Sequence, residues 1–89
     1  MKTMPFKKAG RIALERGRLQ VEIDDLGRFA FDEMTLVDEA GERHGYVMES
    51  SSGRAVNFHM AGRLYTVVRA QFLRLVAGDI GKAAVFEVA

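Results

Sequence analysis

Two histidines, His44 and His59, are the side chains of this chain best suited to proton transfer or metal binding. If the segments around them pair as strands, Tyr46 lies opposite His59, His44 shares that face and Asn57 is nearby. A metal site needs three or four convergent ligands, and no carboxylate is obviously placed beside these histidines. We therefore expect two partly exposed histidines and no bound metal.

The other residues able to do chemistry occur in patterns typical of turns. The serines of 50–52 precede Gly53, where hydroxyls bond the local backbone, and no base or oxyanion hole is evident for a nucleophile. The pairs Asp24-Asp25 and Asp32-Glu33 are adjacent in sequence, so their side chains diverge in an extended chain. The chain has no cysteine and no phosphate-binding glycine motif. We expect no catalytic site and no cofactor, and hence a protein that is not an enzyme.

A repeated dipeptide marks the starts of the strands that we expect to position these residues. Gly-Arg occurs five times, each time before an apolar-rich run, at Gly10-Arg11, Gly17-Arg18, Gly27-Arg28, Gly53-Arg54 and Gly62-Arg63. Glycine turns the chain at little steric cost, and alternating apolar and polar residues are strand patterning. The 89 residues suffice for one domain. We predict a mainly β domain over 10–89, a strongly bent antiparallel meander or partly closed barrel of six or seven strands.

The first hairpin has a register that two kinds of evidence support. A two-residue loop at Arg16-Gly17 sets five pairs opposite one another: Glu15 and Arg18, Leu14 and Leu19, Ile12 and Val21, Arg11 and Glu22, and Gly10 and Ile23. One face is then wholly apolar, while the other holds the two charge pairs. A slip of one residue would lose both features, so we predict this register.

The middle of the chain continues as short strands. A three-residue loop at Asp25-Leu26-Gly27 predicts the pairs Ile23–Phe29 and Val21–Phe31. We expect a bulge or bend at Asp32-Glu33 and a turn at 38–41. Segments 43–49, 55–60 and 63–68 then form a meander.

The last quarter changes from a strand period to a helix period. Val68, Phe72, Leu75 and Val76 form one helical stripe, and Gly78 is placed to end the helix. About nine residues are too few for a stable isolated helix, so this helix must dock on the sheet. The 63–68 strand is apolar on both sides, which predicts a strand covered on both faces. Segment 83–88 reads as a closing strand that pairs back into the sheet.

Charge is strongly segregated along the chain, although the net charge is only +1. Residues 1–18 carry a net +5, residues 19–42 a net −7 and residues 43–89 a net +3. These blocks either create a dipolar surface or neutralise one another on adjacent strands. Residues 1–9 are expected to form a basic arm, the part of the chain best able to be flexible.

Binding is the favoured class of function, in two versions. In the first, another protein or a second copy of the chain binds to apolar area that the helix either covers or leaves open, with Tyr46, Met48, His59 and Leu64 as the contact residues. In the alternative, nucleic acid binds to the basic arm and the arginines at strand starts, that is, Lys2, Lys7, Lys8, Arg11, Arg28, Arg54 and Arg63. The acidic block 22–42 opposes this alternative because it repels phosphates.

The sequence also bears on location. The basic start has no apolar stretch behind it, so it does not resemble a secretory signal. No run approaches the 18 apolar residues of a membrane-spanning helix. We therefore expect a cytoplasmic protein that does not act at a membrane.

Overall fold

The computed structural model describes residues 6–49 and 53–88, which form a mainly β domain with one short helix before the final strand. This confirms the predicted fold class, but the described residues form nine strands, so the prediction of six or seven was wrong. The elements in chain order are β1 (Phe6–Glu15), β2 (Arg18–Ile23), β3 (Gly27–Asp32), β4 (Thr35–Asp38), β5 (Arg43–His44), β6 (Tyr46–Glu49), β7 (Ala55–Met60), β8 (Arg63–Val68), α1 (Arg69–Val76) and β9 (Lys82–Val88).

The hairpin of β1 and β2 has the predicted register throughout, from Glu15 opposite Arg18 to Gly10 opposite Ile23. Its inward face supplies the fully buried Ile12 and Val21. Two side-chain predictions were wrong in detail. Leu14 stays exposed because it lies near the hairpin tip, and the carboxylate of Glu15 forms its ion pair with Arg28, on β3, at 3.4 Å.

The turn between β2 and β3 differs from its prediction by two residues. Ile23 lies opposite Gly27 and Val21 opposite Phe29, so the predicted pairs Ile23–Phe29 and Val21–Phe31 were wrong. The loop consists of residues 24–26, and Gly27 already belongs to β3. A shift of two residues keeps each side chain on its face of the sheet, so Phe29 is still buried.

The segments after β3 are shorter than the sequence indicated. Glu33 has a left-handed backbone (φ 58°), and Asp32 pairs with Thr35, so this site is a hairpin turn rather than a bulge within one strand. The predicted strand 43–49 is divided at Gly45 (φ 60°), where an added Cβ would lie 1.8 Å from the carbonyl oxygen of His59. Only glycine allows the chain to pass so close to β7.

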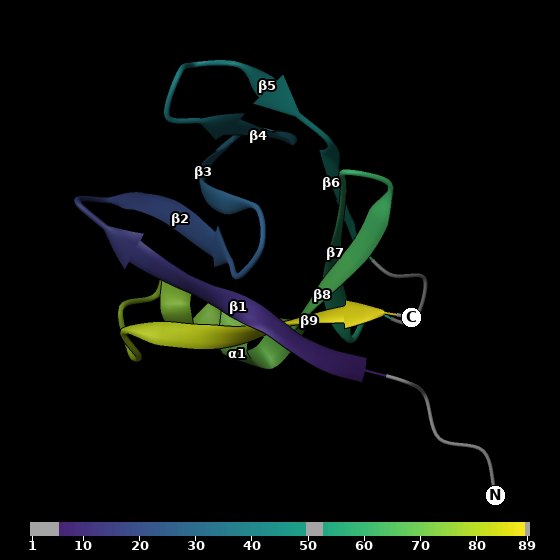
Figure 1. The fold of residues 1–89 in the computed structure, drawn as a ribbon. Helices are drawn as coiled ribbons and strands as arrows, with labels where there is room; N and C mark the ends of the chain where they lie inside the picture. Colours follow the sequence, from purple (N-terminus) through teal and green to yellow (C-terminus); the bar gives the residue numbers. More distant parts are fainter. Residues whose placement is uncertain (1–5, 50–52, 89) are drawn as a thin grey trace, which may run out of the picture.

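The last strand joins two groups of strands into one sheet. The order is β5-β4-β3-β2-β1-β9-β8-β7-β6, so β9 lies between β1 and β8, as predicted for a strand that pairs back into the sheet. Figure 1 shows β9 (yellow) beside β1 (purple), with β2 to β5 on one side and β6 to β8 on the other. The Val47 amide donates to the carbonyl of Met34 at 2.8 Å. This bond brings β6 to the turn before β4 and nearly closes the sheet into a barrel.

The core lies inside this curved sheet and alternates as the sequence predicted. Every second residue of β7 and β8 is buried, namely Val56, Phe58, Met60, Tyr65 and Val67. Phe58 stacks on Tyr65, with ring centroids 5.4 Å apart. The prediction that β8 is covered on both faces was wrong: its other side is only half-buried at Leu64 and is exposed at Val68.

Helix α1 packs on β1, β7, β8 and β9 through the buried Leu75 and the half-buried Phe72. Val68 and Val76, the other members of the predicted stripe, are exposed, because Val68 ends β8 and Val76 is the last helical residue. Gly78 (φ 83°) ends the helix as predicted, and its amide bonds Leu75 while that of Asp79 bonds Arg74. The described residues contain no helix long and apolar enough to cross a membrane.

Candidate protein-binding face and histidine cluster

A row of side chains crosses four strands on the outer face of the sheet. Tyr46 lies opposite His59, His59 opposite Leu64, and Leu64 opposite Val88. The Tyr46 and His59 rings stack with centroids 5.0 Å apart, although Tyr46 is 52% exposed. The structure therefore brings together three of the four residues that the sequence analysis named for protein binding, Tyr46, His59 and Leu64.

A shallow apolar hollow lies on the same outer face. It has a volume of about 320 Å³ and is lined by Phe6, Arg54, Ala55, Thr66, Val68 and Phe86. Phe6 and Val68 are each 50% exposed. Phe6 lies opposite Val88, so the hollow and the row of Tyr46 share one surface. We call this surface, formed by the row and the hollow, the apolar face.

The apolar face carries positive charge at its edge and, among the described side chains, no carboxylate. The exposed Lys8 lies opposite Phe86, and Arg54 lines the hollow. Glu87 pairs with the buried Tyr65, and its side chain therefore points to the opposite side of the sheet. A partner that brings carboxylates to the rim would meet complementary charge.

Met48, the fourth residue named for protein binding, lines a second hollow. This cleft of about 740 Å³ lies between the tip of the first hairpin, the turn before β4, strand β6 and the helix, and its lining includes Leu14, Met34, Phe72 and Val76. Met34 is 59% exposed at the edge of the cleft. Met48 also lies on the side of the sheet that holds the apolar face, because its partner on β7 is Asn57, two residues from His59.

Three of the four arginines named for nucleic-acid binding form ion pairs with carboxylates of the same chain. Arg11 forms an ion pair with Glu22, Arg28 with Glu15 at 3.4 Å and Arg63 with Asp25 at 2.6 Å. The hydrogen bond from Arg63 holds the pKa of Asp25 below its usual value. Neutralised guanidinium groups attract phosphates less, so no feature of these pairs favours nucleic acid.

The remaining basic candidates are placed as follows. Lys7 and Lys8 are exposed at the start of β1, and Arg54 is exposed beside the apolar hollow. Lys2 lies outside the described residues, as do the serines of 50–52.

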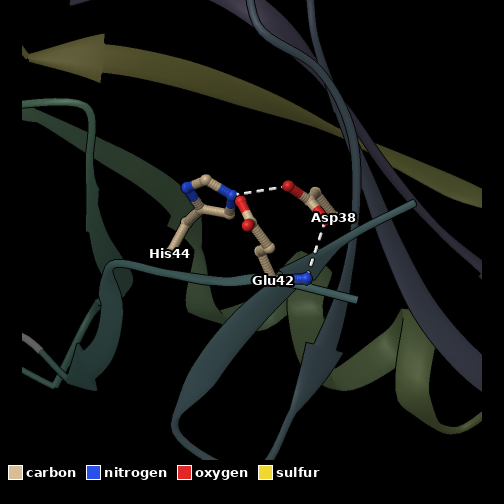
Figure 2. A group of neighbouring side chains, drawn as sticks. All are labelled: Asp38, Glu42 and His44. Atoms are coloured by element: carbon tan, nitrogen blue, oxygen red, sulfur yellow. Dashed lines mark hydrogen bonds and ion pairs between the residues drawn. The ribbon is translucent and has the colours of Figure 1, made fainter. Parts of the chain in front are cut away.

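A cluster that the sequence analysis missed surrounds His44. Its Nε2 atom lies 2.7 Å from Asp38 Oδ2, and Figure 2 shows the carboxylate of Glu42 beside this contact. The expectation that no carboxylate lies beside the histidines was wrong for His44. The turn after β4 reverses the chain, and this reversal brings residues 38, 42 and 44 together. The spacing Asp-x₃-Glu-x-His across a predicted turn was the available signal.

The Asp38 carboxylate is held by several hydrogen bonds. Its Oδ1 atom accepts bonds from the amides of Ala40 and Glu42, both at 2.9 Å, while Oδ2 faces His44. The bond with His44, and then the bond from the Glu42 amide, hold the pKa of Asp38 below its usual value. His44 also lies edge-on to Phe29, with centroids 5.5 Å apart. His44 and His59 thus have different neighbours, and the structure does not pair them.

The chain therefore has two candidate binding surfaces, the apolar face and the cluster around His44. The sequence analysis missed Phe6, Phe86 and Val88 of the first because their neighbours depend on where β9 enters the sheet. Comparison with models of protein families, with curated proteins and with solved structures finds no match to this chain. What this chain binds must therefore be inferred from its own side chains.

Proposed function

We propose that this chain is a small, non-enzymatic binding module whose apolar face docks on another protein. The supporting observation is the continuity of that face: an unbroken set of apolar and aromatic side chains runs from Tyr46 on β6 to Phe6 on β1. Exposed apolar surface of this kind is costly for a protein unless a partner covers it. Aromatic side chains are also enriched where proteins bind one another.

The charge around this face favours a partner with a defined chemistry. The exposed Lys8 lies at its edge, and no described carboxylate on strands β6, β7, β8 and β9 faces outward. A second copy that docked through the same face would offer Lys8 no described carboxylate. We therefore favour a different protein, one that presents apolar side chains flanked by carboxylates.

Photo-crosslinking tests this proposal in cells. Benzoylphenylalanine placed at Val68 lies in the apolar face, whereas the same residue at the exposed Arg18 reports on the outer side of β2. We expect a defined protein adduct from position 68 and none from position 18. The purified adduct partner is expected to carry an acidic, partly apolar surface, and its affinity should fall at least tenfold for Leu64→Asp.

Other results would contradict the proposal. Equal adducts from both positions, or none from position 68, would mean that the apolar face is not a docking surface. An adduct of twice the chain mass, together with a dimer in light scattering, would mean that a second copy binds instead of an acidic partner. A cytoplasmic location is proposed together with this function, and imaging of a tagged chain tests it.

A further inference from the structure

We propose that Asp38, Glu42 and His44 form a binding site for a divalent cation of the zinc class. The three side chains come from the turn between β4 and β5, and their ligand atoms all lie within 4.8 Å of one another. This site is separate from the apolar face, so the two proposals stand independently. It departs from the sequence-based expectation that the chain binds no metal.

The distances require only small movements to reach coordination geometry. Zinc binds imidazole nitrogen and carboxylate oxygen at about 2.1 Å, which places two ligands of a tetrahedral site about 3.4 Å apart. The Nε2 of His44 and the Oδ2 of Asp38 are closer than this, at 2.7 Å, because a proton now lies between them. The exposed Glu42 side chain can move without disturbing the core.

Two of the ligands are already oriented. The amides of Ala40 and Glu42 hold Asp38 by its Oδ1 atom, so that Oδ2 is directed at His44. The ring of Phe29 contacts the imidazole edge-on. Hydrogen bonds and packing that fix metal ligands in this way are worth about 10- to 100-fold in affinity.

The nearest cation in the sequence is directed elsewhere. Arg43 lies between Glu42 and His44, but its guanidinium donates to Asp32 Oδ2 at 3.0 Å and to Thr35 Oγ1 at 2.7 Å. It therefore makes its bonds on the β3–β4 turn instead of with the cluster. The two carboxylates retain the negative charge that attracts a metal ion.

The donor set selects the class of metal. One imidazole and two carboxylates suit zinc, nickel or copper, whereas calcium and magnesium require six or more oxygen ligands. The chain has no cysteine, so thiolate ligands are excluded. Three protein ligands leave at least one coordination position open, so the ion in this exposed site is exchangeable.

Calorimetric titration of chelator-treated protein with zinc sulfate tests the proposal. We expect one ion to bind per chain and His44→Gln to lose at least tenfold in affinity. His59→Gln is the matched control, because it removes the only other histidine and leaves the cluster intact. Glu42→Gln is expected to weaken binding while leaving the fold unchanged, since its side chain is exposed.

Several outcomes would overturn this site. These are wild-type protein that binds no zinc, equal losses in the two histidine variants, or calcium that binds as tightly as zinc. If His44→Gln fails to fold, as judged by circular dichroism, Glu42→Gln decides the question. Unchanged zinc affinity in that variant would then contradict the proposal.

Discussion

The strands β2 to β5 and the strands β6 to β9 contribute to one core, yet their outer faces differ in kind. The outer face of the first group is charged, with ion pairs from Arg11 on β1 to Glu22 and from Arg43 to Asp32. The outer face of the second group is the apolar face that contains Tyr46 and Val68. Since both groups already bury side chains inside the barrel, the apolar outer face is not needed for the core.

This difference separates the buried side chains, which stabilise the fold, from the outer faces, which are available to a partner. Exposed ion pairs contribute only about 0–1 kcal/mol each to the free energy of unfolding. The pairs on the charged outer face therefore favour one strand register but add little stability. Water solvates an exposed apolar face poorly, so contact between this face and another apolar surface is favourable. We therefore expect substitutions to lower the free energy of unfolding most inside the barrel, less at the junction of the two groups of strands, and least on the charged outer face.

The largest loss of stability on substitution is expected inside the barrel. Phe58 is fully buried and contacts the rings of Phe31 and Tyr65, so Phe58→Ala should cost about 3–5 kcal/mol in the free energy of unfolding. Urea denaturation measures this loss. Phe86→Ala, on the apolar face, is the control and should cost about 1 kcal/mol. Equal losses would show that both faces of the sheet are core.

The next effect is expected at the junction between the two groups of strands. Gly45→Ala places a Cβ against the carbonyl of His59 in a left-handed backbone, so we expect a loss of about 2–3 kcal/mol. Gly17→Ala is matched in backbone conformation but meets nothing within 4 Å, and should cost about 1 kcal/mol. If the two variants unfold at the same urea concentration, the close approach at Gly45 does not hold the junction.

A smaller effect is expected on the charged side. Arg11→Glu reverses one member of an exposed cross-strand pair with Glu22, so its cost should be about 1 kcal/mol. Thermal or urea unfolding at low and high salt measures it, and salt should reduce the difference. A loss above about 2 kcal/mol would mean that this pair is structural, and the two outer faces would then differ less than proposed.

The smallest effect concerns pH and the ion pair that joins the two groups. Because Arg63 lowers the pKa of Asp25 in the folded state, the pair stabilises the fold above the usual Asp value near 4, and this stabilisation is lost as pH falls through the lowered pKa. Asp25→Asn should therefore be slightly less stable than wild type at pH 7, and this difference in the free energy of unfolding should shrink as the pH falls below the usual Asp value. A difference that persists unchanged at pH 2 would mean that the charge of Asp25 is irrelevant.

The sequence predicted local features where neighbours in space are also neighbours along the chain. The register of the first hairpin, the alternation in β7 and β8 and the glycine that ends the helix all follow from turn length and residue period. The β2–β3 register was wrong by two residues because such a shift preserves the apolar pattern. For the same reason, alternation alone cannot choose between the two registers.

The two candidate sites were predictable only in part. Tyr46, His59 and Leu64 share a face because β6, β7 and β8 are consecutive strands joined by short loops. Phe6 and Phe86 complete that face only because β9 inserts between β1 and β8, a long-range pairing that no local pattern encodes. The cluster of Asp38, Glu42 and His44 depends on how tightly one turn closes.

The sequence by itself determined that this chain is a mainly β domain without cysteine chemistry, because residue period and composition act through short-range sterics and burial. Only the tertiary structure decided which outer face stays apolar and which is covered by ion pairs. It also placed the carboxylate of Asp38 against His44. These contacts depend on the order in which strands join the sheet and on exact turn geometry, and many arrangements with the same pattern of apolar residues would satisfy the core equally well.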